Sequence, residues 1–268
     1  MPVAASKAPW RDCAVSDPLL QIRGLTKRFG GVLASDGISL DLPAGEVHAI
    51  IGPNGAGKST LIGQLAGEIA PDAGRIIFDG CDITNLPRHR RSALGLARSF
   101  QITSLFLDFT VLDNVALAVQ AHAGHSFRFW RPARSEAKLR QPARAALARV
   151  GLEGRAELVC ANLSHGEHRQ LEIAMALATA PRLFLLDEPM AGMGPDESAR
   201  MIALLGELKR EQTILLIEHD MDAVFRLADR ITVLVDGRVI ASGAPDDIRA
   251  DAAVRQAYLG TEKAGRHG

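Results

Sequence analysis

The chain has 268 residues with 31 basic and 31 acidic side chains, so its formal net charge is zero at pH 7. Zero net charge argues against a nucleic-acid-binding protein held by a bulk basic field, and an apolar content of 47% excludes a disordered chain. No run approaches the roughly 18 apolar residues of a membrane helix, and residues 1–18 lack the apolar segment of a secretory signal. We therefore expect a cytoplasmic protein that reaches a membrane only through a partner.

The first hundred residues are dominated by predicted strands and turns. Residues 1–18 contain three prolines and no apolar pattern, so we expect a flexible N-terminal tail there. Glycine-rich segments and Asp-Gly pairs separate the elements that follow. In chain order, apolar patterns predict strands over 19–25, 38–42, 46–51, 75–78 and 96–100, and helices over 58–67 and 88–94.

Helices become more frequent after residue 100, and they alternate with strands towards the C-terminus. The unbroken apolar runs at 183–186 and 214–217 are typical of central parallel strands that are covered on both faces. The whole pattern predicts one α/β core that is interrupted by a helical insert. Helices are predicted over 111–121, 135–150, 167–178, 197–210 and 221–228, and strands over 183–186, 214–217 and 231–235.

A glycine-rich segment between a predicted strand and a predicted helix matches the phosphate-binding pattern G-x-x-x-x-G-K-[ST]. Its glycines let backbone N–H groups turn towards phosphate oxygens, and the following helix adds partial positive charge. Lys58 would reach the β and γ phosphates, and the Ser59 hydroxyl would bind Mg²⁺. The segment predicts binding of a nucleotide and Mg²⁺, and leaves kinase, GTPase and transport ATPase open. It consists of Gly52, Pro53, Asn54, Gly55, Ala56, Gly57, Lys58, Ser59 and Thr60.

Two of the predicted buried strands end in ionisable side chains. Asp187 and Glu188 follow the strand at 183–186, and His219 follows the strand at 214–217. Because ligand sites of open α/β sheets lie at the carboxyl ends of strands, these residues are candidates for the same site. Asp187 suits the binding of Mg²⁺ through water, and Glu188 suits a general base that orients the attacking water. His219 either senses the γ-phosphate or is an ordinary hydrogen-bonded residue at a strand end.

The segment Leu163-Ser164-His165-Gly166-Glu167 precedes a predicted amphipathic helix. Its local interpretation is a helix start, with Ser164 as the N-cap and Glu167 completing a capping box. An exposed Ser and Gly at a helix N-terminus can also bind an anion. The same geometry becomes functional if the anion is the nucleotide of a second subunit.

The order of these motifs resembles the ATP-binding subunits of ABC transporters over about residues 19–260. The resemblance implies a P-loop NTPase fold with a RecA-like core, an antiparallel β portion near the N-terminus and an inserted α-helical subdomain. The expected boundaries are a core over 19–100 and 166–245, a helical subdomain over 101–165, and tails over 1–18 and 261–268.

The resemblance also implies roles for individual residues. Phe29 matches the aromatic side chain that stacks on adenine, and Gln101 matches the glutamine that contacts Mg²⁺ or water and links the site to the membrane partner. Ser164, Gly166 and Glu167 match the signature that contacts ATP across a dimer interface. ATP hydrolysis would then use Glu188, His219 and Gln101, with Mg²⁺ held by Ser59, Gln101 and Asp187.

Two departures from the family pattern affect the expected contacts between subunits. His165 and Glu167 stand where Gly and Gln are commonest in the signature, although Ser164 and Gly166 are kept. The segment after Glu188 has Gly194 where the family usually has an Asp. The resemblance therefore assigns this position no role in communication across the dimer.

Local features resemble the importers of branched-chain and other hydrophobic amino acids and the related urea and amide importers. These features are 27–32, 171–176, 191–193 and the long stretch from Gln101 to Ser164. This branch implies permease subunits, a second ATP-binding subunit that is identical or homologous, a periplasmic solute-binding protein and no nucleic acid. It places the chain on the cytoplasmic face of the inner membrane.

Three alternatives remain open from the sequence. They are a lipid or lipopolysaccharide exporter subunit, a soluble ABC ATPase and a P-loop kinase. The Arg and aromatic residues within 122–134 are either a solvated insertion or a contact for a partner subunit or a lipid headgroup. The solute itself and the choice between homodimer and heterodimer are not encoded in these motifs.

Overall fold

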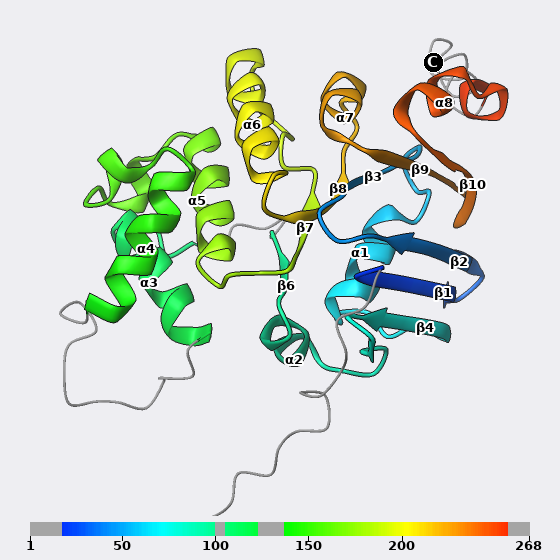
Figure 1. Cartoon of the computed structure of the whole chain (residues 1–268), viewed down its shortest axis with the longest axis horizontal. Helices are drawn as coiled ribbons and strands as arrows, with labels where there is room; N and C mark the ends of the chain where they lie inside the picture. The colour runs from blue at the N-terminus through cyan, green and yellow to red at the C-terminus, as the bar shows by residue number, and fades with distance from the viewer. Residues whose placement is uncertain (1–17, 100–104, 123–136, 257–268) are drawn as a thin grey trace, which may run out of the picture.

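The computed structural model describes residues 18–99, 105–122 and 137–256 (Figure 1). The predicted tails, Gln101 and the Arg and aromatic stretch at 127–134 therefore lie outside the described residues, apart from Pro18. The strands are β1 (Leu20–Phe29), β2 (Val32–Leu42), β3 (Val47–Ile51), β4 (Ala73–Phe78), β5 (Cys81–Asp82), β6 (Leu96–Arg98), β7 (Leu183–Asp187), β8 (Thr213–Ile217), β9 (Arg230–Val235) and β10 (Arg238–Gly243). The α-helices are α1 (Lys58–Ala66), α2 (Arg88–Ala93), α3 (Val111–His122), α4 (Ala137–Arg149), α5 (His165–Leu177), α6 (Pro195–Leu208), α7 (Met221–Leu227) and α8 (Pro245–Ala250).

The strands form two sheets. An antiparallel sheet has the order β2-β1-β4-β5, and a six-stranded sheet has the order β10-β9-β3-β8-β7-β6. Within the larger sheet, β9, β3, β8, β7 and β6 are parallel and β10 is antiparallel to β9. Every residue of β3, β7 and β8 is buried. This confirms the expected α/β fold with central parallel strands covered on both faces.

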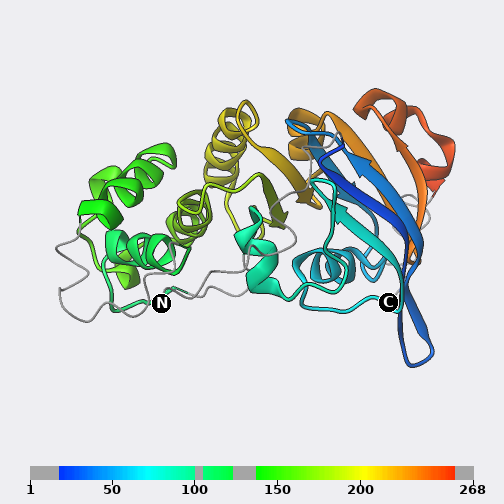
Figure 2. The ribbon, with the colours of Figure 1, turned by 60° about the horizontal axis from the view of Figure 1, so that its bottom comes forward.

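Three hydrophobic clusters hold the layers together. One packs the antiparallel sheet and α1 against one face of the parallel sheet. A second packs α3, α4 and α5 together and continues to α6 and the other face, and a third packs α7 and α8 against β3 and β9. Figure 2 shows the helices α3 and α4 and the antiparallel sheet at opposite ends of the molecule, with the parallel sheet between them.

The first hairpin is longer than the sequence predicts. Strands were expected over 19–25 and 38–42, but β1 continues to Phe29 and β2 begins at Val32. Gly24 and Gly37 have positive φ values of 59° and 66°, and the β1–β2 register shifts after Ile22 and again beyond Leu25. The glycines therefore produce irregularities within continuous strands rather than ending them.

The C-terminal region contains elements that the sequence analysis does not predict. Strand β10 and helix α8 follow β9, with Asp236 and Gly237 in the turn between β9 and β10. Both turn residues have positive φ, at 46° and 77°. An Asp-Gly pair between two alternating segments is a hairpin signal that could have identified β10.

Candidate nucleotide-binding site

The phosphate loop has the local geometry that its sequence predicts. It connects β3 to α1, and Gly55 and Gly57 have positive φ values of 82° and 100°. A Cβ atom on Gly57 would lie 2.1 Å from the carbonyl oxygen of Ala34, and one on Gly52 would lie 2.0 Å from that of Leu234. Close backbone packing therefore requires glycine at both positions, and left-handed backbone favours it at Gly57.

Lys58 lies folded over the loop that precedes it. Its Nζ donates hydrogen bonds to the carbonyl oxygens of Gly52 (2.7 Å) and Pro53 (2.9 Å). Burial lowers the pKa of Lys58, and the carboxylates of Glu188 and Asp187 oppose this shift. The ammonium group of Lys58 lies at the loop, where it can pair with an anion.

The start of α1 is open to an acceptor. Gly57 occupies the N-cap position and provides no side-chain hydrogen bond to the first turn. The first N–H groups of a helix need an acceptor from outside the helix, and the helix dipole favours a negative one. Ser59 and Thr60 lie in this first turn, and the Ser59 side chain is exposed. Asn54 and Gly55 are exposed at the tip of the loop, and Ala56 is buried.

Asp187 ends β7 as a buried carboxylate with one oxygen unpaired. Its Oδ2 accepts a hydrogen bond from Nη2 of Arg98 at 3.1 Å, and its Oδ1 is buried without a hydrogen-bond partner. Burial raises the pKa of Asp187, and Arg98 opposes this shift. Since a buried oxygen without a donor is costly, it marks a position where a hydrated cation fits. The residues present thus fit a nucleotide phosphate together with Mg²⁺.

Glu188 and His219 meet at the ends of adjacent parallel strands. Oε1 of Glu188 lies 2.6 Å from Nε2 of His219. Glu188 has a positive φ of 50°, and its backbone is held by hydrogen bonds with Ile217 and Ala191. Left-handed backbone at a non-glycine residue is strained and is common at functional sites. The structure therefore brings together the two acids and the histidine that the sequence placed at strand ends.

Two residues that support this site were not predicted from the sequence. Glu218 is buried and accepts hydrogen bonds from the backbone N–H of Met190 (3.0 Å) and of His219 (2.9 Å), which ties the ends of β7 and β8 together. Arg98 holds Asp187 from β6. A charged residue inside a short apolar strand was the signal for Arg98, because such a residue needs a buried partner.

Phe29 lies at the tip of the β1–β2 hairpin, where it pairs with Val32. Its ring is about half exposed, at 48%, and Nζ of Lys27 lies 5.4 Å from the ring centroid. Within the same hairpin, the carbonyl oxygen of Ala34 packs closely against Gly57 of the phosphate loop. An aromatic ring that is half exposed keeps surface available for stacking.

The signature segment forms the start of α5. Ser164 Oγ accepts a hydrogen bond from the N–H of Glu167, and the N–H of Ser164 donates to the Glu167 carboxylate, so the predicted capping box is confirmed. The Glu167 carboxylate also pairs with Arg155 at 3.2 Å. A Cβ on Gly166 would lie 2.7 Å from Oε1 of Glu197. Ser164 and Gly166 line a surface hollow of about 580 Å³.

His165 contacts the segment whose sequence departs from the family pattern. Its Nε2 lies 3.3 Å from the carbonyl oxygen of Ala191, and a Cβ on Gly192 would lie 3.4 Å from the same nitrogen. The two departures from the family pattern, His165 and the segment 191–194, are therefore in contact with each other.

A single chain keeps the signature segment apart from the phosphate loop. In both Figure 1 and Figure 2, α5 and α1 lie on opposite sides of β6 and β7. Ser164 begins α5, whereas Lys58 begins α1. One nucleotide therefore reaches both helix starts only if a second subunit supplies one of them.

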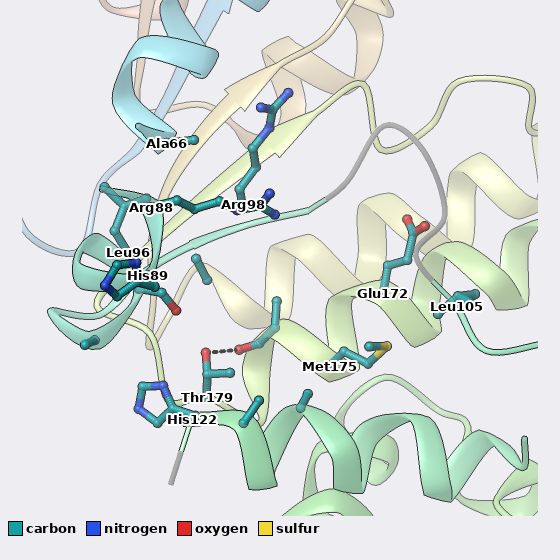
Figure 3. Close-up of a pocket in the computed structure, with 16 residues that line it drawn as sticks. Ala66, Arg88, His89, Leu96, Arg98, Leu105, His122, Glu172, Met175 and Thr179 are labelled. Carbon is teal, nitrogen blue, oxygen red and sulfur yellow. Dashed lines mark hydrogen bonds between the residues drawn. The ribbon is translucent and has the colours of Figure 1, made fainter. Parts of the chain in front are cut away.

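A groove of about 380 Å³ separates the core from the helical region (Figure 3). One wall comes from α2 and β6, and the other comes from α3 and α5. Its lining is largely apolar, and Figure 3 places Arg88, His89 and Arg98 at one end and Glu172 and Met175 at the other. The lining residues include Leu96, Leu105, Ala118, Glu172, Met175 and Ala176.

Comparison with known proteins identifies the family. A model described as "ABC transporter" matches residues 35–191, and one described as "Branched-chain amino acid ATP-binding cassette transporter" matches residues 238–264. The chain is 40% identical over 253 residues to the high-affinity branched-chain amino acid transport ATP-binding protein BraF of Pseudomonas aeruginosa, covering 92% of this chain and 99% of BraF. The chain belongs to the ATP-binding subunits of ABC transporters.

Further relatives place this ABC ATPase in the group that contains BraF and LivG. The high-affinity branched-chain amino acid transport ATP-binding protein LivG of Escherichia coli is 39% identical over 258 residues, covering 92% of this chain and 99% of LivG. The crystal structure of the ADP conformation of MJ1267, an ATP-binding cassette of an ABC transporter, superimposes with a TM-score of 0.80 at 31% identity, covering 90% of this chain and 98% of MJ1267. The family resemblance expected from the motifs is confirmed.

Family membership gives the general activity. This ABC ATPase binds nucleotide and couples ATP hydrolysis to transport. ATP-binding subunits of this family work with permease subunits and dimerise, and the dimeric cassette MJ0796 matches with a TM-score of 0.72 at 26% identity, covering 84% of this chain and 98% of MJ0796. The protein is thus a component of a membrane transporter. Across residues 18–99, 105–122 and 137–256, no helix is both long enough and apolar enough to cross a bilayer.

Proposed function

We propose that this chain is the ATP-hydrolysing subunit that powers an importer of branched-chain or related hydrophobic amino acids. The observation that carries the proposal is the likeness to BraF and LivG over 99% of their lengths. The match of residues 238–264 to a branched-chain amino-acid cassette model supports the same solute class. This likeness favours an importer over the exporter, the soluble ATPase and the kinase that the motifs left open.

The phosphate loop is proposed to hold the phosphates of ATP. Lys58 would exchange its two loop carbonyls for phosphate oxygens, and the first-turn N–H groups of α1 would donate to the same anion. Ser59, Asp187 and Gln101 would hold Mg²⁺, which when bound neutralises charge on the transferring phosphoryl group. The exposed ring of Phe29 would stack on adenine.

Glu188 is proposed as the general base that orients the attacking water. The hydrogen bond from His219 fixes one carboxylate oxygen of Glu188, while the strained backbone fixes the direction of its side chain. Positioning of this kind lowers the reorganisation needed at the moment of reaction. His219 would also steady the γ-phosphate from the neighbouring strand end.

Two subunits are proposed to share each ATP. The separation of α5 from α1 within one chain supports this arrangement, because the two helices lie on opposite sides of β6 and β7. The hollow at the start of α5 would face the phosphate loop of an identical or homologous subunit. Glu167 would act there through the capping box that holds Ser164 in place.

The groove between the core and the helical region is proposed as the contact for a permease subunit. The groove is mostly apolar, and Leu105 in its lining is four residues from Gln101, the residue expected to link the site to the permease. The stacked rings of Phe106 and Phe109, which are exposed on the surface, extend the apolar surface near this point. We further propose a periplasmic solute-binding protein as an indirect partner and the cytoplasmic face of the inner membrane as the location.

The domain division is likewise a proposal. The ATP-binding domain would span residues 19–260, with a core over 19–100 and 166–245 and a helical subdomain over 101–165. Helix α5 follows the second boundary and packs against both α3 and α4, so it would connect the helical subdomain to the core.

The test is transport by the assembled complex in proteoliposomes, with its own permease subunits and solute-binding protein. ATP-dependent uptake of labelled leucine is expected, and export of lipid without amino-acid uptake would refute the proposed function. Glu188→Gln is expected to bind ATP and to accumulate as a dimer while its turnover collapses. Near-normal turnover in that variant would refute the role of Glu188.

A further inference from the structure

A chain of alternating charges connects the groove to the nucleotide site. Nη2 of Arg98 lies 3.1 Å from Oδ2 of Asp187, and Nη1 of Arg98 donates to Oε2 of Glu68. The other oxygen of Glu68, Oε1, lies 3.5 Å from Nη1 of Arg88. Each bridging side chain therefore uses separate atoms for its two partners, and the chain runs Arg88–Glu68–Arg98–Asp187.

Exposure falls steadily along this chain. The side chains of Arg88, Glu68, Arg98 and Asp187 are 48%, 33%, 12% and 0% exposed. An exposed ion pair is screened and weak, whereas a buried pair is strongly coupled and costly to break. The outer pair is therefore easily exchanged for another partner, and the inner pair holds Asp187 in place.

The groove has a basic end at Arg88. Arg88, His89 and Arg98 line that end, and Glu172 at the opposite end is the acidic residue among the described lining residues (Figure 3). Charge complementarity therefore favours an occupant with an apolar body and an acidic group directed towards α2.

We propose that an acidic group of the permease segment in this groove pairs with Arg88 and thereby acts on Asp187 through Glu68 and Arg98. The inference rests on the proposed docking of the permease in the groove. Arg98 acts as a positioning residue for Asp187, and Arg88 is the most exposed member of the chain.

The physical basis is the sharing of one carboxylate between two guanidinium groups. When the groove is empty, Glu68 neutralises Arg88 and Arg98 together. When an acidic group of the partner pairs with Arg88, Glu68 no longer shares its negative charge with Arg88 and interacts with Arg98 alone. The net positive charge that faces Asp187 then falls, so Asp187 attracts Mg²⁺ more strongly while Arg98 still fixes its orientation.

The experiment measures the Mg²⁺ concentration that half-saturates binding of a fluorescent, non-hydrolysable ATP analogue. It is carried out on the isolated full chain and on the complex with its permease subunits. Arg88→Gln leaves Glu68 to Arg98 and is expected to lower this concentration by about threefold in the isolated chain. Glu68→Gln exposes Asp187 to the full charge of Arg98 and is expected to raise it by about threefold.

Assembly with the permease is expected to lower the half-saturating Mg²⁺ concentration of the unmodified chain. In Arg88→Gln and Glu68→Gln, assembly is expected to leave this concentration unchanged. Arg144→Gln is the matched control, because Arg144 is also half-exposed on a helix and pairs with one glutamate, Glu157. The control is expected to behave as the unmodified chain does. Opposite shifts for the two variants support the relay, and shifts in the same direction overturn it.

The substitution Ala118→Cys in the groove, tested for crosslinking to the permease in every variant, separates the two proposals. Absence of a crosslink in the unmodified complex would refute docking in the groove. A normal crosslink in Glu68→Gln together with a normal Mg²⁺ shift on assembly would overturn the relay and leave docking intact.

Discussion

The Nε2 atom of His219 lies 2.6 Å from Oε1 of Glu188, although the two residues are 31 positions apart in the chain. Strands β7 and β8 are adjacent and parallel, with Asp187 opposite Ile217. Glu188 is the first residue beyond Asp187 and His219 is the second beyond Ile217, so the strand register brings the carboxylate and the imidazole close together.

This contact predicts a specific kinetic defect for His219→Ala. Removing the imidazole frees the Glu188 carboxylate to rotate, so we expect kcat for ATP hydrolysis to fall by about 100-fold. ATP affinity should change by much less, because Lys58 and the loop remain. His219→Gln can still donate to Glu188 and should recover part of the loss. An unchanged kcat for ATP hydrolysis in His219→Ala would contradict the role of His219 in orienting Glu188.

Gly57→Ala should destabilise the protein as well as weaken ATP binding. The new Cβ would meet the Ala34 carbonyl oxygen at 2.1 Å, and the backbone has a φ of 100°. Left-handed strain alone costs about 1–3 kcal/mol. The control is Gly151→Ala, with a φ of 76° and nothing near its added Cβ. Chemical denaturation should show a larger loss for Gly57→Ala, and equal losses would show that the steric contact is unimportant.

Substitution of Arg91, which lies outside the nucleotide site, should cause a large loss in the free energy of unfolding. Its buried guanidinium donates to the carbonyl oxygens of Gln64 and Leu65 (both 2.7 Å), Thr84 (2.8 Å) and Leu86 (2.9 Å). Burial lowers its pKa to about 10, so the group remains charged at neutral pH.

Arg91→Met would leave these carbonyl groups without their donor, and we expect it to lower the free energy of unfolding by about 3–5 kcal/mol. Arg149→Met is the comparison, because its pair with Glu211 is on the surface and should contribute about 1 kcal/mol or less. Thermal or urea denaturation of both variants would measure the difference. Similar losses would contradict a structural role for the buried guanidinium.

The buried carboxyl group of Glu172 should make the stability of the folded protein depend on pH. Burial raises its pKa, and the hydrogen bond and charge of Arg169 oppose that shift. The unfolded chain therefore releases this proton at a lower pH than the folded chain does. Between the two pKa values the folded state binds more protons, so stability falls as pH rises through that window.

Glu172→Gln keeps an acceptor for Arg169 and removes the ionisation. The variant is expected to be more stable than the unmodified protein at about pH 8, with an advantage that shrinks as pH falls through the raised pKa. Glu157→Gln, which changes an exposed acid, is the control and should show little pH-dependent difference. Melting curves at several pH values test this, and a constant difference at all pH values would contradict it.

Much of the site was predictable because its pieces are local in sequence. The loop from Gly52 to Thr60 lies between β3 and α1, as its strand–glycine–helix pattern predicts. The capping box at Ser164 and Glu167 depends on residues only three positions apart, and it was predicted correctly. Hydrogen bonds within one turn are determined by residue type and spacing, so the sequence shows them directly.

Other features depended on contacts between distant residues. Arg98 and Asp187 are 89 positions apart. The local pattern indicates that Arg98 needs a buried partner, but it does not identify Asp187 as that partner. The second strand was expected to begin only after Gly37, but Gly37 lies within β2, because pairing along both strands tolerates the local irregularities. The separation of α5 from α1 also depends on the order of strands in the larger sheet.

The sequence alone determined the chemistry of this protein: a loop for phosphate, acids at strand ends and a capped helix that begins at Ser164. The tertiary structure alone decided which of these groups meet. Glu188 meets His219, Asp187 meets Arg98, and Ser164 lies before α5, apart from the phosphate loop that precedes α1. The physical reason is that residue type and spacing control interactions within a few positions, whereas the register of parallel strands and the packing of helices control those between distant segments.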